Sequence, residues 1–261
     1  FQIKDIKKLK LKKKFKIITA LSVFYDLKSP GNFIKEVRDI LDKKGVFILE
    51  HADLLSIIKN NIFDTICHEH IEYYSSKVII EMMNHNRLKV FDHEFNDING
   101  GSSRYYISHE KSNYKVKQKK INKLLLDERK IFLYSKKTYK VFFKKILKER
   151  KKLKKLIREI KNKKMIIHGY GASTKGNVIL QFYGIGNKEI NYIADRNPLK
   201  HNLFTPGTKI KIISEDYSRR LRPDYYLVLP WHFKKEILIR ERKIRKKGTK
   251  FIFPLPKVKI V

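Results

Sequence analysis

Hydrophobic and polar positions along this chain come in an order typical of an α/β protein. Short apolar runs at 15–20 and 46–50 predict buried strands. Between them, apolar residues recur at helical spacing after Ser29-Pro30, a sequence that favours a helix start, and we expect this helix to end at Gly45. A strand, a helix and a strand in this order predict parallel pairing with a right-handed crossover.

A predicted helix at 76–84 and two strand-like runs, at 88–95 and 103–108, come next. The turn sequence Asn99-Gly100-Gly101 separates the two runs, so we expect an antiparallel hairpin on the edge of the parallel sheet. Residues 113–163 change to long helices with one apolar face and many lysines on the other. We interpret them as a linker that packs its apolar stripe on a neighbouring domain; a membrane or RNA surface is the alternative.

A second α/β unit begins near Lys164. Four apolar runs predict its strands, at 165–168, 190–194, 225–229 and 250–253. A glycine-containing turn follows the first run and enters a helix that reaches about Tyr183, and a last helix runs from near His232 to just before Gly248. This pattern predicts a compact Rossmann-like sheet.

The charge of the chain is extreme, with 61 Lys and Arg against 26 Asp and Glu and a formal net charge of +35. The basic residues lie along nearly the whole chain, and no RNA-recognition signature accompanies them. We therefore interpret the charge as solvated surface, and do not expect nucleic acid as a partner. No apolar run approaches the length of a membrane span, so we expect no membrane association.

Cysteine usage narrows the class of protein further. Cys67 is the single cysteine, which excludes a disulfide framework and a structural zinc site made of cysteines. This usage fits a reducing compartment, so we expect a cytoplasmic protein. Hydrophobic residues make up 42% of the chain, enough for a real core. The chain begins with Phe1 and not Met, from which we expect a fragment.

The densest reactive chemistry lies in the segment that contains His68-Glu69-His70. Two histidines that flank a carboxylate can supply a general base near pH 7 and a group that orients it. Their spacing differs from the helical His-Glu-x-x-His pattern, and we predict no metal ligands. A metal site and a polar loop with satisfied histidines are the alternatives.

A second candidate site is the turn that contains Gly169, Gly171 and Gly176. Glycines after a strand let backbone N–H groups approach a phosphate, and the start of a helix adds partial positive charge. We expect ligand contacts from this turn and from the end of the next strand, namely from Gly171, Lys175, Asn177, Asp195, Arg196 and Asn197. An NAD(P)-dependent oxidoreductase and a tight packing turn are the alternatives.

Together these segments resemble the sugar C-methyltransferase family of antibiotic and surface-glycan pathways. The resemblance rests on FDTICHEHIEYYS, INGGSSRYY, HGYGASTKGN, IADRNPLKHNLFTPGTKIKI, RPDYYLVLPWHFKKEI and FIFPLPKVKIV, in the family's order and from about Ile18 to the C-terminus. It implies an α/β fold in three parts: an incomplete class I methyltransferase sheet in residues 1–112, a helical linker in 113–163, and a Rossmann-like C-terminal domain in 164–261.

The resemblance implies an enzyme that transfers a methyl group from S-adenosylmethionine to a carbon of a nucleotide-linked keto-deoxysugar. The binding partner would be a nucleotide-diphosphate sugar. The family's motif assigns the general base to His70, with Glu69 and His68 beside it. Cys67, which stands where the family commonly has tyrosine, and Tyr73 would contact the substrate.

The resemblance also implies where the cofactor binds. The family's cofactor-lining segment corresponds to Thr19, Ala20, Ser22, Val23 and Phe24. Asp26 stands where many members have a histidine. Members also carry a zinc-binding cysteine cluster and a glycine-rich cofactor loop; neither precedes Phe15 here, so we expect the zinc ligands to be absent and the cofactor to bind weakly. The sugar, the methylated carbon and the oligomeric state stay open.

Overall fold

A computed structural model describes residues 14–261 and divides into two compact units. Unit 1 holds the described residues up to Ile58 together with 68–138, and unit 2 holds 59–67 together with 139–261. The short segment 59–67 therefore belongs to unit 2, although its sequence neighbours on both sides belong to unit 1. The predicted linker, 113–163, is shared between the two units.

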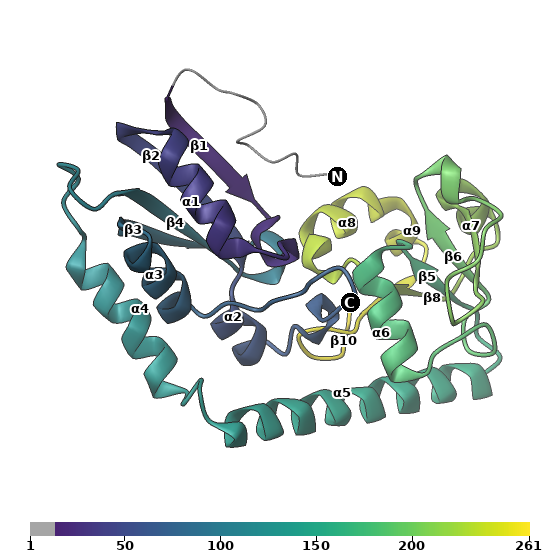
Figure 1. Cartoon of the computed structure of the whole chain (residues 1–261). Helices are drawn as coiled ribbons and strands as arrows, with labels where there is room; N and C mark the ends of the chain where they lie inside the picture. The colour runs from purple at the N-terminus through teal and green to yellow at the C-terminus, as the bar shows by residue number, and fades with distance from the viewer. Residues whose placement is uncertain (1–13) are drawn as a thin grey trace. The chain divides into compact units, whose positions relative to one another are not determined.

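Unit 1 is built on a four-stranded sheet with the order β1-β2-β4-β3 (Figure 1). β1 and β2 are parallel, and β4 is antiparallel to both of its neighbours. The elements are β1 (Phe15–Leu21), η2 (Phe24–Asp26), α1 (Pro30–Ile40), β2 (Leu41–Ala52), α2 (Leu54–Lys59), α3 (Ser76–His85), β3 (Leu88–Asn96), η4 (Ile98–Gly100), β4 (Ser102–His109) and α4 (Gln118–Lys130).

The predicted strand, helix and strand of unit 1 are confirmed, with one correction at Gly45. The helix α1 ends at Ile40 and β2 begins at Leu41, so Gly45 lies inside the strand and does not end the helix. A Cβ at this position would lie 2.8 Å from the carbonyl oxygen of Phe15. Glycine at this position allows β1 to approach β2 closely, at the point where the register between the two strands shifts.

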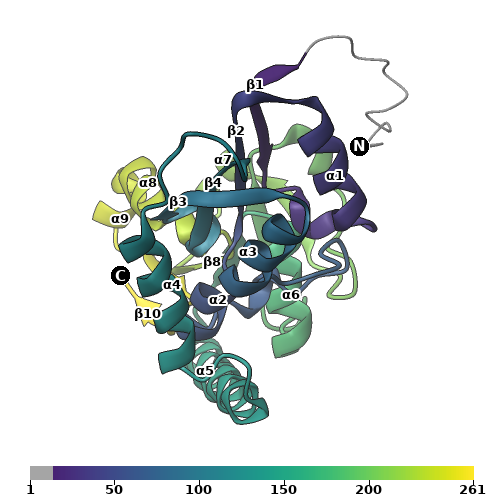
Figure 2. The same cartoon turned by 60° about the vertical axis from the view of Figure 1, so that its left-hand side comes forward.

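The predicted hairpin is confirmed as β3 and β4, with Asn99, Gly100 and Gly101 at positive φ in the turn. The helix α3 also begins as predicted, because the Ser75 side chain accepts a hydrogen bond from the Val78 N–H at 3.3 Å. α3 and α4 both lie against β3 (Figure 2). The core of the unit gathers fully buried side chains from the sheet and its helices, among them Phe24, Ile34, Val37, Phe47, Leu49, Ile79, Met83, Leu88, Tyr105 and Ile107.

Unit 2 contains a six-stranded sheet with the order β10-β9-β8-β5-β6-β7, parallel except for the terminal β10. The elements are η3 (Phe63–Thr65), α5 (Lys136–Asn162, which begins in unit 1), β5 (Ile167–Tyr170), α6 (Thr174–Tyr183), β6 (Tyr192–Asp195), η5 (Pro198–Lys200), β7 (Lys211–Ser214), α7 (Glu215–Arg220), β8 (Tyr225–Val228), η6 (Trp231–Phe233), α8 (Lys234–Arg240), α9 (Arg242–Lys246), β9 (Lys250–Phe253) and β10 (Lys259–Ile260).

This strand order confirms the predicted Rossmann-like sheet. The chain runs outward from β5 through β6 to β7 and then returns to β8, so the order reverses between β5 and β8. Open α/β sheets bind ligands beyond the carboxyl ends of the strands at such a reversal. The sequence did not predict β7 and α7, and the single helix expected before Gly248 is divided into η6, α8 and α9.

The long basic helix α5 buries one stripe of apolar side chains, made of Phe142, Ile146, Leu153, Ile157 and Ile160. Two aromatic residues of the same helix, Tyr139 and Phe143, are exposed by 40% and 50%. The buried stripe supports the interpretation of α5 as a packing helix. Within residues 14–261, no helix combines the length and the apolar character needed to cross a membrane.

Candidate functional site

The segment around the predicted catalytic motif is divided between the units at Cys67 and His68. The first half, residues 59–67, is anchored in unit 2 by the short helix η3. The Phe63 ring in this helix packs against Phe182 and Tyr183 of α6, with ring centroids 5.3 Å and 5.0 Å away. The second half, from His68 onward, belongs to unit 1 and contacts Tyr25 in the loop after β1.

Asp64 is the centre of the half that lies in unit 2. Its side chain is fully buried, and Oδ2 accepts a hydrogen bond from the indole N–H of Trp231 at 2.8 Å. Oδ1 has no hydrogen-bond partner within residues 14–261. Burial raises the pKa of Asp64 to about 6, against the opposing effects of the Trp231 bond and the positive charge of Lys175. A carboxyl group placed in this way is costly to ionise and needs its partners.

Lys175, a predicted ligand residue, is the cation whose charge lowers the pKa of the Asp64 carboxyl. Burial lowers its pKa, and the charges of Asp64 and Cys67 raise it. Cys67 and Lys175 therefore lie close enough in unit 2 to interact electrostatically. The sequence did not predict this proximity. His232 joins them: burial first, and then the Lys175 charge, lower its pKa to about 4, so it is neutral near pH 7.

The turn after β5 requires glycine at position 171. Gly171 has φ of +83°, and a Cβ there would lie 2.7 Å from the Pro230 ring. Ser173 begins α6, and its side chain accepts a hydrogen bond from the Gly176 N–H at 3.0 Å. Asn177 lies in the first turn of α6, and its Oδ1 is buried without a hydrogen-bond partner in the described part of the chain, as is Nδ1 of His232.

Asp195, at the end of β6, accepts hydrogen bonds from two backbone amides. Its Oδ2 accepts the Ala172 N–H at 2.7 Å, and its Oδ1 accepts the Asn197 N–H at 2.8 Å. Both carboxylate oxygens thus hold the two turns that follow β5 and β6. The Asn197 side chain is also used locally, since it accepts the Leu199 N–H. Arg196 is exposed, and no acid within residues 14–261 pairs with it.

In unit 1, the three predicted catalytic residues differ in exposure: His68 and Glu69 are exposed, and His70 is half-buried. The His70 ring lies against Tyr25, with centroids 4.1 Å apart, and near Tyr73 at 6.2 Å. The backbone supports this placement, because the N–H groups that follow His70 donate to the Tyr25 carbonyl oxygen at 2.9 Å and 3.2 Å.

His70 also lies close to the acid that follows the predicted cofactor segment. Burial raises the pKa of Asp26, the positive charge of His70 lowers it, and Glu69 raises it. These effects place Asp26, Glu69 and His70 in one electrostatic group. Two carboxylates beside an imidazole stabilise its protonated form, which a general base reaches once it has accepted a proton.

The predicted cofactor residues fall into two sets. Thr19 is exposed and Ser22 is half-buried at the carboxyl end of β1, where Ser22 has φ of +56° and its N–H donates to the Glu50 carbonyl oxygen at 2.8 Å. Ala20 and Phe24 are buried, and the Phe24 ring packs on Tyr74 with centroids 5.0 Å apart. Phe24 therefore supports the loop from within the core.

The sequence predicted no role for Asp64, Trp231 or His232. One signal was available: Trp231 is the single tryptophan of the chain and follows a predicted strand at its carboxyl end. Its pairing with a residue 167 positions earlier could not be read from spacing. Within residues 14–261, no group of three or more His, Cys, Asp or Glu side chains could hold a metal ion.

Comparison with known proteins gives two matches in sequence. A family model described as the C-methyltransferase C-terminal domain matches residues 97–256. The C-methyltransferase NovU of Streptomyces niveus is 31% identical over 225 residues, which cover 86% of this chain and 53% of NovU. The chain thus spans about half the length of this curated relative.

Solved structures give more distant likenesses. An S-adenosylmethionine-dependent methyltransferase from Clostridium acetobutylicum is 16% identical with a TM-score of 0.32, over 41% of this chain and 63% of that one. The magnesium protoporphyrin IX methyltransferase of Synechocystis, solved with bound SAH, is 14% identical with a TM-score of 0.31, over 41% and 49%.

Proposed function

Since this chain belongs to the C-methyltransferase family, we propose that it takes part in methyl transfer from S-adenosylmethionine to a carbon of a nucleotide-linked keto-deoxysugar, with His70 as the general base. The observation that carries the proposal is the placement of His70 in unit 1, against Tyr25 and beside Asp26 and Glu69. A carbon next to a ketone becomes a nucleophile only when a base removes its proton, and imidazole suits this task near neutral pH.

The residues of unit 1 fit one side of a cofactor site. Thr19, Ser22 and Val23 are not in the core and stand at the carboxyl end of β1, the edge at which α/β sheets bind ligands. They would hold the cofactor there, whereas Phe24 supports them from behind. When bound, S-adenosylmethionine supplies an electrophilic methyl group. The described residues offer zinc no ligand set, so no step of the proposal involves zinc.

His70 would accept the proton from the sugar carbon at one of its ring nitrogens. Tyr25 holds the ring by a tilted aromatic contact, and Asp26 and Glu69 stabilise the resulting imidazolium by their charge. Exposure of His68 and Glu69 leaves the approach to this group open to solvent and substrate.

The first experiment isolates the proton-removal step. Exchange of the sugar's acidic C–H with deuterated water is measured with this chain and a nucleotide-diphosphate keto-deoxysugar. His70→Asn should lower the exchange rate ~10²–10⁴-fold, as loss of a general base does. His68→Asn and Glu69→Gln are the matched controls and should retain more activity. If either control abolishes exchange while His70→Asn retains it, the base is not His70.

Unit 2 would hold the nucleotide part of the substrate. Support comes from the reversal point of its sheet, where Asn177 Oδ1 and His232 Nδ1 are buried without hydrogen-bond partners among the described residues. Lys175 and Arg196 add positive charge suited to a diphosphate. The engagement of both Asp195 oxygens with backbone amides weighs against the oxidoreductase alternative, in which that acid binds a ribose.

Thermal unfolding with added ligand tests this second part. A nucleotide-diphosphate sugar should raise the Tm of the chain, and NAD should raise it less. Asn177→Ala should reduce the rise, whereas Asn187→Ala, at an exposed asparagine of the same unit, should not. A larger rise with NAD than with the sugar nucleotide would favour the oxidoreductase.

A further inference from the structure

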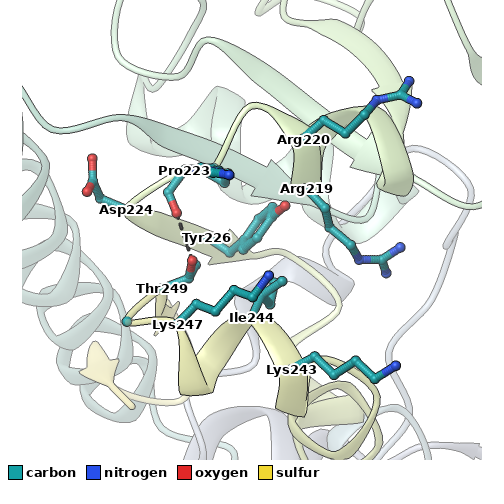
Figure 3. A pocket seen from close by; sticks show the side chains of 11 residues that line it. Arg219, Arg220, Pro223, Asp224, Tyr226, Lys243, Ile244, Lys247 and Thr249 are labelled. Carbon is teal, nitrogen blue, oxygen red and sulfur yellow. Dashed lines mark hydrogen bonds between the residues drawn. The ribbon is translucent and has the colours of Figure 1, made fainter.

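The amino-terminal edge of the unit 2 sheet carries a hollow that the proposed function does not use. Its volume is about 960 Å³. Asp224 and Thr249, in its wall, directly precede β8 and β9, whereas the Gly171 turn follows β5 at the opposite edge. Figure 3 shows its lining side chains, which are Arg219, Arg220, Arg222, Pro223, Asp224, Tyr226, Lys243, Ile244, Lys247 and Thr249, with Gly248.

Side chains in the wall of the hollow are held by hydrogen bonds to their neighbours. Tyr226 is buried, and its hydroxyl is hydrogen-bonded to Ser218 Oγ at 2.7 Å. Thr249 Oγ1 donates to the Pro223 carbonyl oxygen at 3.0 Å, drawn as a dashed line in Figure 3. A ligand would therefore meet a surface that is already in place, which reduces the entropy lost on binding.

Two of the charged side chains in the wall are already engaged. Asp224 Oδ2 accepts the Ile166 N–H at 2.7 Å, so the single acid of the wall is tied to the start of a strand. Arg219 bonds to three acids, at distances from 2.5 Å to 2.9 Å, which are Glu215, Asp216 and Glu241. The charge of Arg219 is compensated, and this residue is structural.

Four cations stay without an acid partner in the part of the chain that the structure describes: Arg220, Arg222, Lys243 and Lys247. They come from two short segments, 220–222 and 243–247, which line one hollow. In Figure 3 the Lys247 and Ile244 side chains lie together below the Tyr226 ring, and the Arg220 side chain points away from them. Positive side chains gathered around a concave floor favour a compact anion with several charges.

We propose that this hollow is an anion site for the polyphosphate group of a small ligand. Arg220 lies over the Tyr217 ring, 5.6 Å from its centroid, so the charges available to a ligand are those of Arg222, Lys243 and Lys247. One phosphate would leave part of this charge unmatched, and the hollow is large enough for a drug-sized ligand. Nucleic acid fits less well, because it needs positive charge along an extended surface, whereas these cations surround a single hollow. The site lies at the opposite edge of the sheet from the proposed sugar-nucleotide residues and is independent of methyl transfer.

Calorimetry with this chain and inorganic tripolyphosphate as the probe tests the proposal. We expect a dissociation constant of about 0.1 mM or tighter at low salt. The double variant Lys243→Gln and Lys247→Gln should weaken binding about tenfold, because it removes two charge-assisted contacts. Arg222→Gly is a second variant; glycine is compatible with the φ of +49° at this position, so the loss of the charge is not accompanied by strain.

A matched control separates this site from the general charge of the chain. Lys148→Gln with Lys151→Gln removes two exposed lysines of α5 and the same net charge, and should leave tripolyphosphate binding within about twofold. Equal weakening by both pairs, or no binding by the unmodified chain, overturns the proposal. Tighter binding of a duplex RNA that depends on the same two lysines overturns it too, in favour of a nucleic-acid surface.

Discussion

The two halves of the segment that contains the predicted catalytic motif have opposite environments, although they are consecutive in sequence. Asp64 is buried in unit 2, where Trp231 holds one oxygen and burial raises its pKa. His68 and Glu69 are exposed in unit 1, and His70 is half-buried against Tyr25. A dense run of polar residues is therefore not one structural unit: the first half is buried and anchors the segment, and the second half is largely exposed.

The largest expected difference between the halves is in stability. Asp64→Ala leaves the indole N–H of Trp231 buried and unpaired and removes a countercharge of Lys175, so it should lower the free energy of unfolding by about 2–4 kcal/mol. His70→Ala should lower it by no more than about 1 kcal/mol, since the ring is partly exposed. Urea unfolding measures both. Equal losses would mean that both halves are structural.

Substitution of Trp231, the hydrogen-bond partner of Asp64, is a second test of the difference between the two halves. Trp231→Phe keeps most of the apolar area and removes the donor, which leaves Asp64 Oδ2 buried without its bond. We expect a loss of about 1–3 kcal/mol in the free energy of unfolding. Tyr217→Phe, at an exposed aromatic residue of the same unit, should change it by less than about 0.5 kcal/mol. A neutral Trp231→Phe would show that the indole bond does not anchor the segment.

The pH dependence of stability tests the buried half of the segment through the titration of Asp64. Its pKa is raised from 3.8 to about 6 in the folded chain, so between pH 4 and 6 the folded state binds more protons than the unfolded state. The contribution of Asp64 to stability should therefore fall by about 1–3 kcal/mol as the pH rises through this range, and then stay constant.

Asp64→Asn removes this titration. The free energy of unfolding of the variant, minus that of the unmodified chain, should rise between pH 4 and 6 by the same amount. Taking the difference removes the opposite contribution of four histidines, His51, His93, His168 and His232, whose pKa values burial lowers to about 4. A difference that does not change with pH would mean that the Asp64 carboxyl titrates as it does in water.

The smallest expected effect concerns the helix that carries Lys175. Ser173→Ala removes the side chain that accepts the Gly176 N–H, and should cost about 1 kcal/mol. Ser29→Ala is the control: Ser29 also precedes a helix, but its side chain makes no capping bond, so we expect almost no change. Thermal unfolding distinguishes the two. A similar loss in both variants would show that the loss comes from propensity and not from the cap.

Local patterns were enough to predict most elements of the fold. The strand runs at 15–20 and 103–108, the helix at 76–84 and the glycine turn after β5 depend on near neighbours in sequence, and the structure has each of them. The sequence did not predict β7, whose four residues include only two apolar ones, Ile212 and Ile213, or α7, which is only six residues long. Gly45 was misplaced because a glycine that ends a helix and one that admits a neighbouring strand look alike in sequence.

The sequence alone determined the order of the elements, the α/β class, and the residue types of the candidate base, because these depend on spacing over a few residues. Only the tertiary structure decided which of the polar side chains are buried, and with what. Trp231 meets Asp64 across 167 residues, and both Asp195 oxygens turn to backbone amides. Burial and pairing depend on contacts between distant segments, and those contacts, through desolvation, set the charge that each side chain can carry.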